Sequence, residues 1–286
     1  MSALRLRTWE GPEIGRASDA VVAFLERQEA VHNLALSILA GARGGRDEGL
    51  RYLAAVERSG AVVAVGMRTE IKYLLAAAED PQAVDLLAED ARARHADLPG
   101  WLGPDAVAER FAQVWAREGG VASCVAMRLR IHELTAVRPA VRAAGRLRPA
   151  EPRDLGLLVA WSEGLQVAVG APARHDPAET ARRELDAGTS VLWENAAGQT
   201  VSMAAWGGAT PHGIRIRKVY TPPEHRNRGY AEACVAALSA QLLASGRRFC
   251  FLYTDLANPT SNAVYGRVGY VPVCDAADHR TQLAPA

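Results

Sequence analysis

The stretch YTPPEHRNRGYAEA, residues Tyr220 to Ala233, decides the fold of the second half of this chain. Pro222 and Pro223 cannot continue a strand ladder, and the small residues after Gly229 favour a helix. A helix that begins directly after a tight turn directs unpaired backbone N–H groups outward, and its dipole favours an anion there. The stretch therefore predicts an anion-binding turn.

The positive charge of this region is local. The chain has 286 residues and a formal net charge of +1, which argues against a nucleic-acid-binding protein. Between His212 and Tyr230, however, the single acid Glu224 faces five cations, namely Arg215, Arg217, Lys218, Arg226 and Arg228. An ordinary strand-to-helix turn with solvated arginines is the alternative interpretation.

Composition indicates a globular chain with room for two domains, because 49% of the residues are hydrophobic and 23% are charged. No signal peptide and no apolar run of about 20 residues is present, so we expect no membrane partner. Four widely spaced cysteines without a CxxC pair predict a reduced, cytoplasmic protein without a bound metal.

The second half divides into clear elements. Asp176 is typical of an N-cap, and the residues after Thr189 predict a hairpin. A strand over 213–221 alternates Ile214, Ile216 and, after a shift, Val219. The elements expected after it are a helix over 229–245, a strand over 247–255, a helix capped by Asn258, and final strands in 270–274 and 279–283.

The first half shows the same order more faintly. It predicts a helical segment over 17–42, a hairpin turning at Ser59-Gly60, a strand over 70–78 and a helix capped by Asp80. A strand edge and a helix are expected over 98–120, followed by a closing strand over 122–134. No residue-level repeat accompanies this order. The prolines and arginines of 135–154 indicate a boundary in the first part of that stretch, about 135–145, between domains 1–137 and 145–286.

Two known phosphate motifs are absent. The chain has no GxxxxGK[ST] sequence and no GxGxxG sequence that opens a βαβ unit. The hairpin before the turn also argues against a parallel dinucleotide-binding sheet.

The segment VYTPPEHRNRGYAEACVAAL resembles the acetyl-CoA pyrophosphate motif of the GNAT superfamily of N-acetyltransferases, and NPTSNAVYGRVGYVPV resembles the motif that follows it. The resemblance covers about Gly145 to Leu283. It implies an α/β (α+β) fold of two tandem GNAT-like domains, each a mixed, mostly antiparallel twisted sheet flanked by helices, with acetyl-CoA (coenzyme A) bound in 145–286. Domain 1–137 lacks the pyrophosphate motif, so we expect it to be degenerate and non-catalytic.

The resemblance also implies roles for individual residues. The residues expected around the pyrophosphate are Arg226, Asn227, Arg228, Gly229, Tyr230 and Ala231. Those expected along the pantetheine arm are Val219, Tyr220 and Thr221, and those near the other side of the cofactor are Asn258 and Ser261.

Acetyl transfer to an amine requires stabilisation of a developing oxyanion and a proton for the departing thiolate. We expect the Val219 N–H to serve the first need and Tyr265 the second, although Tyr265 could instead be a packing residue. The general base stays open among Glu194, Asp255, His212 and Glu163.

The sequence thus predicts direct transfer, through a ternary complex, from acetyl-CoA to a primary amine on a small molecule or peptide. The chain is expected to be a monomer or a homodimer. A non-catalytic coenzyme A or acyl-CoA sensor, or a purely structural protein, are the alternatives.

Overall fold

The computed structural model of the chain describes residues 3–16, 19–45, 49–77, 80–117, 121–138, 143–170 and 176–282. These residues form two compact units. Unit 1 takes its described residues from Met1–Ile131, Thr254–Ala257 and Pro272–Ala286, and unit 2 from His132–Tyr253 and Asn258–Val271.

Unit 1 is built on a mixed sheet whose strands follow the order β1-β2-β3-β4-β5-β12-β6. The first four strands pair antiparallel, β4 and β5 run parallel, and β12 pairs antiparallel with β5. The strands are β1 (Leu4–Glu10), β2 (Leu50–Arg58), β3 (Ala61–Thr69), β4 (Tyr73–Ala77), β5 (Gly100–Pro104), β6 (Ser123–Leu134) and β12 (Val271–Thr281), with the last residues of β6 and the first of β12 in unit 2. The helices are η1 (Gly11–Arg16), α1 (Asp19–Glu26), α2 (Asn33–Arg43), α3 (Pro81–Arg94) and α4 (Asp105–Ala116).

Two hydrophobic cores lie on the two faces of this sheet. One contains side chains of α1 and α2, such as Leu25 and Leu39. The other contains side chains of α3 and α4, such as Leu87 and Phe111. Alternate β-strand residues supply the two cores, because successive strand side chains point to opposite faces.

Unit 2 repeats this plan. Its sheet follows the order β11-β10-β9-β8-β7, with β10 and β11 parallel and the other pairs antiparallel. The strands are β7 (Gly145–Pro149), β8 (Ser190–Asn195), β9 (Thr200–Gly207), β10 (Gly213–Tyr220) and β11 (Phe249–Asp255), whose last two residues are in unit 1. The helices are η2 (Pro152–Asp154), α5 (Leu155–Val169), α6 (Pro177–Asp186), η3 (Pro223–His225), α7 (Tyr230–Ala244) and α8 (Pro259–Val268).

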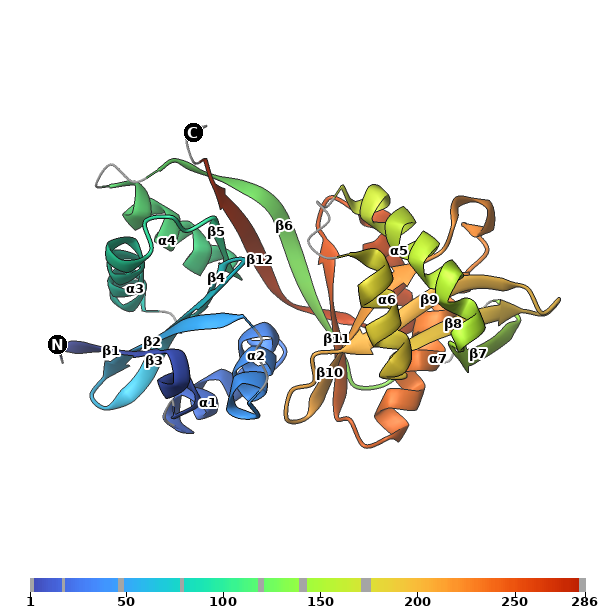
Figure 1. Cartoon of the computed structure of the whole chain (residues 1–286), viewed down its shortest axis with the longest axis horizontal. Coiled ribbons are helices and arrows are strands. Elements are labelled where there is room, and N and C mark those ends of the chain that lie inside the picture. Colours follow the sequence, from blue (N-terminus) through green and yellow to red (C-terminus); the bar gives the residue numbers. More distant parts are fainter. Residues whose placement is uncertain are drawn as a thin grey trace. The chain divides into compact units, whose positions relative to one another are not determined.

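Helices cover both faces of the unit 2 sheet as well. Side chains of α7 pack with Ile214, Ile216 and Trp193 in one core. Side chains of α5 and α6 pack with Leu192 and Met203 on the opposite face. Figure 1 shows α5 and α6 together in front of β8 and β9, with α7 behind them.

Local sequence signals account for many of these elements. Ser59 and Gly60 both adopt positive φ at the β2–β3 turn, as a two-residue hairpin requires. Asp80 and Asp176 cap α3 and α6 through their carboxylates. The predicted fold class, mixed and mostly antiparallel sheets flanked by helices, is confirmed.

The predicted division at 1–137 and 145–286 differs from the observed units at the C-terminus. Strand β12 belongs mainly to unit 1, because residues Ala276 to Arg280 pair with β5. Gly100 permits this pairing, since a Cβ there would lie 2.0 Å from the carbonyl oxygen of His279. A long-range pairing of this kind leaves no local trace in the sequence.

Other predictions were wrong in detail. The segment 17–42 forms two helices rather than one within its described part, and β1 precedes them as an unpredicted strand. The two short strands expected after 270 form the single strand β12. Among the described residues, no helix has the length and apolar character to cross a membrane.

Candidate functional site

Strands β10 and β11 form a fork. They run parallel and pair only at Gly213–Phe249, Ile214–Cys250 and Arg215–Phe251. Strand β10 nevertheless continues to Tyr220 and β11 to Asp255. The two strands therefore splay apart beside the KVYT segment, and Arg215 marks the point where they part.

A β-bulge lies on the β10 arm of this fork. The register with β9 shifts between Arg217, which pairs with Ala205, and Tyr220, which pairs with Met203. Lys218 adopts φ +52°, which is uncommon for a residue with a Cβ. The bulge resets the alternation of the strand, so Val219 packs against the same core as Ile214 and Ile216.

Glu184 of α6 holds the bulge in place. Its carboxylate accepts a hydrogen bond from Lys218 Nζ at 2.9 Å and lies 3.1 Å from Arg217 Nη1. The Glu184 side chain is only 7% exposed, whereas those of Arg217 and Lys218 are 34% and 22% exposed. Removal of this carboxylate would leave two cations beside a strained strand.

The turn after β10 is fixed by polar contacts to its backbone. Ser202 Oγ donates to the Tyr220 carbonyl oxygen at 3.0 Å and lies 2.9 Å from Thr221 Oγ1. Arg226 Nε donates to the Thr221 carbonyl oxygen at 3.0 Å, and the guanidinium carbon lies 5.8 Å from the centroid of the Tyr220 ring. The turn is thereby held in one conformation before any ligand binds.

The N-terminus of α7 has the properties of an anion site. Asn227 and Gly229 adopt φ +61° and +80°, so the backbone changes direction sharply just before the helix. Gly229 is the N-cap, and no side chain caps the helix in the described structure. The first-turn N–H groups therefore have no intrahelical acceptor, and the exposed side chains of Arg226 and Arg228 lie beside them in sequence. Tyr230 and Ala231, the first two residues of α7, are half-buried.

Helix α8 carries the predicted proton donor. Asn258 Oδ1 accepts from the Ser261 N–H at 3.0 Å, so these two residues form the helix cap. Tyr265 packs against the core that also borders Val219 and Tyr230. Burial, followed by the nearby Cys234, raises the pKa of the Tyr265 hydroxyl above its ordinary value, so the group stays protonated at neutral pH.

The cysteines near this core are not suited to nucleophilic catalysis. Burial raises the thiol pKa of Cys234 and of Cys250 to about 12 each. Both are buried. A covalent acyl-enzyme route through either thiol is therefore disfavoured.

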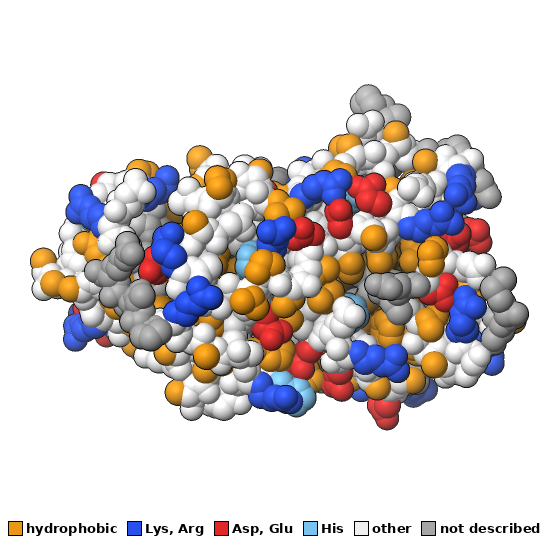
Figure 2. All heavy atoms as spheres, turned by 180° about the vertical axis from the view of Figure 1, so that it is seen from behind, with side chains coloured by type: hydrophobic (Ala, Val, Ile, Leu, Met, Phe, Trp, Pro, Cys, Tyr) orange, Lys and Arg blue, Asp and Glu red, His pale blue; other side chains and the backbone are white. Residues whose placement is uncertain are grey.

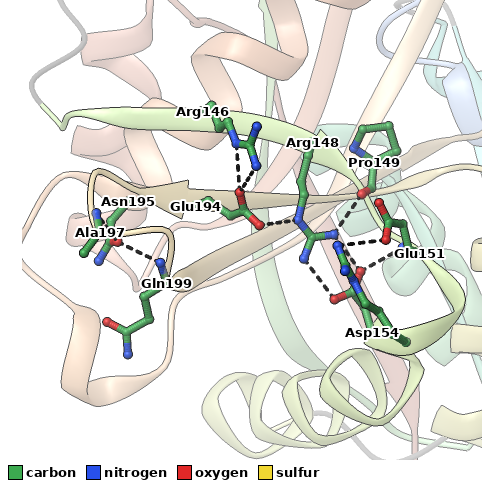
Figure 3. Close-up of polar contacts among 10 residues, drawn as sticks. Arg146, Arg148, Pro149, Glu151, Asp154, Glu194, Asn195, Ala197 and Gln199 are labelled. Carbon is green, nitrogen blue, oxygen red and sulfur yellow. Dashed lines mark hydrogen bonds and ion pairs between the residues drawn. The ribbon is translucent and has the colours of Figure 1, made fainter.

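Figure 3 shows why Glu194, one of the candidate bases, is unsuited to that role. Arg148 Nε donates to Glu194 Oε1 at 2.6 Å, and Arg146 Nε donates to Oε2 at 2.9 Å. Hydrogen bonds from Arg148 and then Arg146 lower the pKa of the Glu194 carboxyl. Arg148 also bonds both carboxylate oxygens of Asp154, so the cluster ties β7 to β8 and to the start of α5.

Of the other candidate bases, only Asp255 lies on the fork, as the last residue of β11. Its Oδ1 accepts from the Ala257 N–H at 2.8 Å. His212 is exposed in the turn before β10, and Glu163 is exposed on α5. None of the four is assigned as the base.

The charge of the anion site is local. On the face that Figure 2 shows, Lys and Arg side chains are interspersed with Asp and Glu side chains over the described residues. This distribution matches the net charge of +1.

Sequence reasoning missed Glu184 and Ser202. A signal for Glu184 was present, because it follows the buried Ala181 by three residues and so lies on the apolar stripe of α6. Ser202 gave no local signal, because its role depends on the pairing of β9 with β10 across the bulge.

Comparisons with known proteins agree with this geometry. The model of the family described as FR47-like protein matches residues 196–277. A GCN5-related N-acetyltransferase from Sphaerobacter thermophilus is 15% identical with a TM-score of 0.64, covering 98% of this chain and 96% of that chain. A tandem GNAT protein from the clavulanic acid biosynthesis pathway is 14% identical with a TM-score of 0.55, covering 99% of both chains. A GNAT-family acetyltransferase from Colwellia psychrerythraea is 11% identical with a TM-score of 0.57, covering 97% of this chain and 100% of that chain. No curated protein sequence matches the chain.

The chain therefore has the fold of GNAT acetyltransferases, and the resemblance found in the sequence is confirmed. This fold supports acyl transfer in general. The segment matched by the FR47-like family contains β10, the turn, α7, β11 and α8, which together make the fork and its anion site.

Proposed function

We propose that this protein is an acetyl-CoA-dependent N-acetyltransferase that transfers an acetyl group directly to a primary amine in a ternary complex. The observation that carries the proposal is the continuous run from the β10–β11 fork, through the bulge at Lys218, to the uncapped N-terminus of α7 at Gly229. An anion site at a helix N-terminus and a free strand edge beside it suit a diphosphate with an amide-bearing arm.

The proposal assigns individual residues to parts of coenzyme A. The N–H groups from Asn227 to Ala231, with Arg226 and Arg228, would hold the pyrophosphate. The β10 edge from Val219 to Thr221 would pair with the pantetheine amides, because these residues follow the last β10–β11 pair at Arg215. Asn258 and Ser261 remain a proposed contact on the other side, in addition to their observed capping role.

Two groups of the chain supply the chemistry. The Val219 N–H lies at the bulge, outside the paired register on both sides, and would donate to the acyl oxygen as negative charge develops there. Loss of one such donor typically costs about 2.7–4 kcal/mol of activation free energy. Tyr265, protonated at neutral pH, would donate a hydrogen bond to the departing thiolate. Coenzyme A brings the activated acetyl group, so no enzyme nucleophile is needed.

Unit 1 is proposed to be a degenerate, non-catalytic GNAT-like domain. The helix equivalent to α7 is α3, and its N-terminus is capped by the Asp80 carboxylate with Pro81 as its first residue. The acid repels an anion and the proline removes an N–H donor. A stoichiometry of one acetyl-CoA per chain follows. Cytoplasmic location and a monomeric or homodimeric state remain parts of this proposal.

Isothermal titration with acetyl-CoA tests the binding part. We expect one site per chain, and the double variant Arg226→Glu with Arg228→Glu should weaken binding at least about 100-fold, because each charged hydrogen bond contributes about 1.5–3 kcal/mol. The matched control is Arg182→Glu with Arg183→Glu, which reverses two exposed arginines on α6 and should leave affinity unchanged.

Release of free thiol from acetyl-CoA with a panel of amines tests the catalytic part. Amine-dependent release supports an acetyltransferase. Tight binding without release for any amine would favour the alternative, a coenzyme A or acyl-CoA sensor. Absence of binding would overturn both.

A further inference from the structure

Strand β10 presents two adjacent guanidinium groups to the face opposite α7. Ile214 and Ile216 point into the core with α7, so Arg215 and Arg217 point the other way. The contact of Arg217 with Glu184 of α6 confirms this direction. Neither arginine is explained by the pyrophosphate site, which lies at the N-terminus of α7.

Arg215 differs from its neighbour in having no carboxylate partner in the described part of the chain. Its Nε is fully buried and makes no hydrogen bond there. Burial lowers the pKa of the Arg215 guanidinium, as does Arg217, while Tyr253 of β11 raises it. Glu184, which contacts Arg217 on this face, is already engaged by Arg217 and Lys218.

An arrangement of this kind is costly without a ligand. A buried cation that lacks a partner loses hydration without compensation, and a like charge beside it adds repulsion. Buried polar groups without a partner are uncommon in folded proteins, and strongly perturbed groups cluster at functional sites. An oxyanion between the two guanidinium groups would remove both penalties.

The neighbouring strand leaves room for these groups. A Cβ at Gly208 would lie 3.1 Å from Arg215 Nη2, and a Cβ at Gly207 would lie 3.2 Å from Arg217 Nη2. Larger residues at these positions would force the guanidinium groups to move. The glycines therefore let both side chains lie close along the surface of the sheet.

The position of Arg215 relates it to the fork. It forms the last β10–β11 pair, with Phe251, before the strands part. Val219 follows four residues later, a span of about 13 Å along an extended strand. Coenzyme A would approach from the α7 side, so the acceptor amine has the opposite face, where Arg215 and Arg217 lie.

We infer that the acceptor is an amine that also carries an oxyanion, a carboxylate or a phosphate, which Arg215 binds with Arg217 beside it. The inference rests on the proposed acetyltransferase function and specifies its substrate class. The planar guanidinium of arginine matches both oxyanions with two parallel hydrogen bonds, so the shared chemistry is a bidentate anion contact.

Matched acceptor pairs test the inference. Amino acids are compared with their amides, and O-phosphoethanolamine with ethanolamine, by kcat/KM for thiol release. The wild-type protein should prefer the anionic member of at least one pair by about tenfold or more, which corresponds to about 1.4 kcal/mol. The pair with the larger ratio distinguishes carboxylate from phosphate.

Variants assign the preference to Arg215. Arg215→Gln should reduce the anionic-to-neutral ratio to about one, mainly through a higher KM for the anionic member, and Arg215→Lys should retain part of it. Arg182→Gln removes an exposed cation from α6 and should leave the ratio unchanged. The affinity for acetyl-CoA should be the same in all three.

The melting temperature supplies a readout that does not require turnover. Arg215→Gln should melt at the same temperature as the wild type or higher, because it removes a half-buried cation whose buried Nε makes no hydrogen bond in the described structure. A lower melting temperature would overturn the inference in favour of a structural role. Equal rates for both members of every pair would overturn it while leaving the acetyltransferase function intact. Binding of acetyl-CoA without turnover of any amine would overturn both.

Discussion

The N-termini of α3 and α7 occupy the same place in the two units but have opposite chemistry. Each follows the fourth strand of its unit, and each helix packs on one face of its sheet. At α7 the cap is Gly229 with φ +80° and no capping side chain. At α3 the Asp80 carboxylate accepts the N–H of Ala83 at 3.3 Å and also pairs with Arg58. The N-terminus of α7 is therefore available to an anion, whereas the N-terminus of α3 already binds the Asp80 carboxylate.

The strands that precede these two helices also differ, in the regularity of their pairing. Strand β10 contains a bulge at Lys218, whereas β4 pairs with β3 in unbroken register from Tyr73 to Ala77. In unit 1 a Cβ on Gly103 of β5 would lie 2.7 Å from Leu75 Cβ of β4, so a buried leucine fills the space between those strands. On the proposed function, the bulge and the helix N-terminus without a capping side chain are the features of unit 2 that the corresponding elements of unit 1 lack.

The largest expected effect comes from giving α7 the cap of α3. Gly229→Asp places a carboxylate at the proposed pyrophosphate site and should weaken acetyl-CoA binding by about 100-fold or more, because it adds like-charge repulsion and occupies the N–H donors. Isothermal titration measures the change. Gly198→Asp is the matched control, since Gly198 has φ +76° and open space around its Cβ position, and it should keep wild-type affinity. Equal losses in both variants would contradict an anion site at Gly229.

The second expected effect comes from giving α8 the aromatic residue of α4. Tyr265 is the seventh residue of α8, and the seventh residue of α4 is the buried Phe111. Tyr265→Phe removes the hydroxyl and little volume, so kcat should fall at least about tenfold, within the range of general acid catalysis, while acetyl-CoA affinity changes little. Steady-state kinetics with titration measure the two quantities separately. Unchanged kcat, with chemistry shown to be rate-limiting, would remove the role.

Features that depend on nearby residues could be predicted from the sequence. Pro222-Pro223 ends β10, Gly229 starts α7 and Asn258 caps α8, and each of these signals lies within a few positions of its effect. The sequence also showed a shift in alternation between Ile216 and Val219, and the structure has a β-bulge at that place, which was not predicted. Local backbone preferences carry this information directly.

Features that depend on distant pairing could not be predicted. Glu194 resembled a candidate base in sequence, yet the pairing of β7 with β8 places Arg146 opposite it and converts it into a structural ion pair. The exchange of β12 into unit 1 depends on contacts between residues about 180 positions apart, such as Ala276 and Pro104. The sequence also could not show that Arg215 lacks a carboxylate partner in the described structure, because this depends on Glu184 pairing with Arg217 and Lys218 instead.

The smallest expected effect is a difference between the two units in how their stability depends on pH. Burial lowers the pKa of His32, His95 and His279 below the ordinary value near 6.5, and all three belong to unit 1. The unfolded chain therefore binds more protons than the folded chain below that value. Their stabilising contribution is present above about pH 6.5 and is lost as the pH falls towards their folded pKa values. In unit 2 the lowered pKa values of Asp154 and Glu194, caused mainly by Arg148, act only at more acidic pH.

Amide hydrogen exchange at about pH 7.5 and about pH 5.5, corrected for the intrinsic rate, should show protection falling in unit 1 before unit 2. His279 is the most direct probe, because both ring nitrogens are buried without a hydrogen-bond partner in the described structure and the ring stacks on Trp101 at 5.2 Å. The charged groups that act on it are Glu109, Arg128, Asp278 and Asp105. His279→Phe keeps the stacking and should make the pH dependence of unit 1 shallower, whereas His212→Gln, an exposed histidine in unit 2, should not change it. Earlier loss of protection in unit 2 would show that its carboxylates, rather than the histidines of unit 1, set the acid stability of the chain.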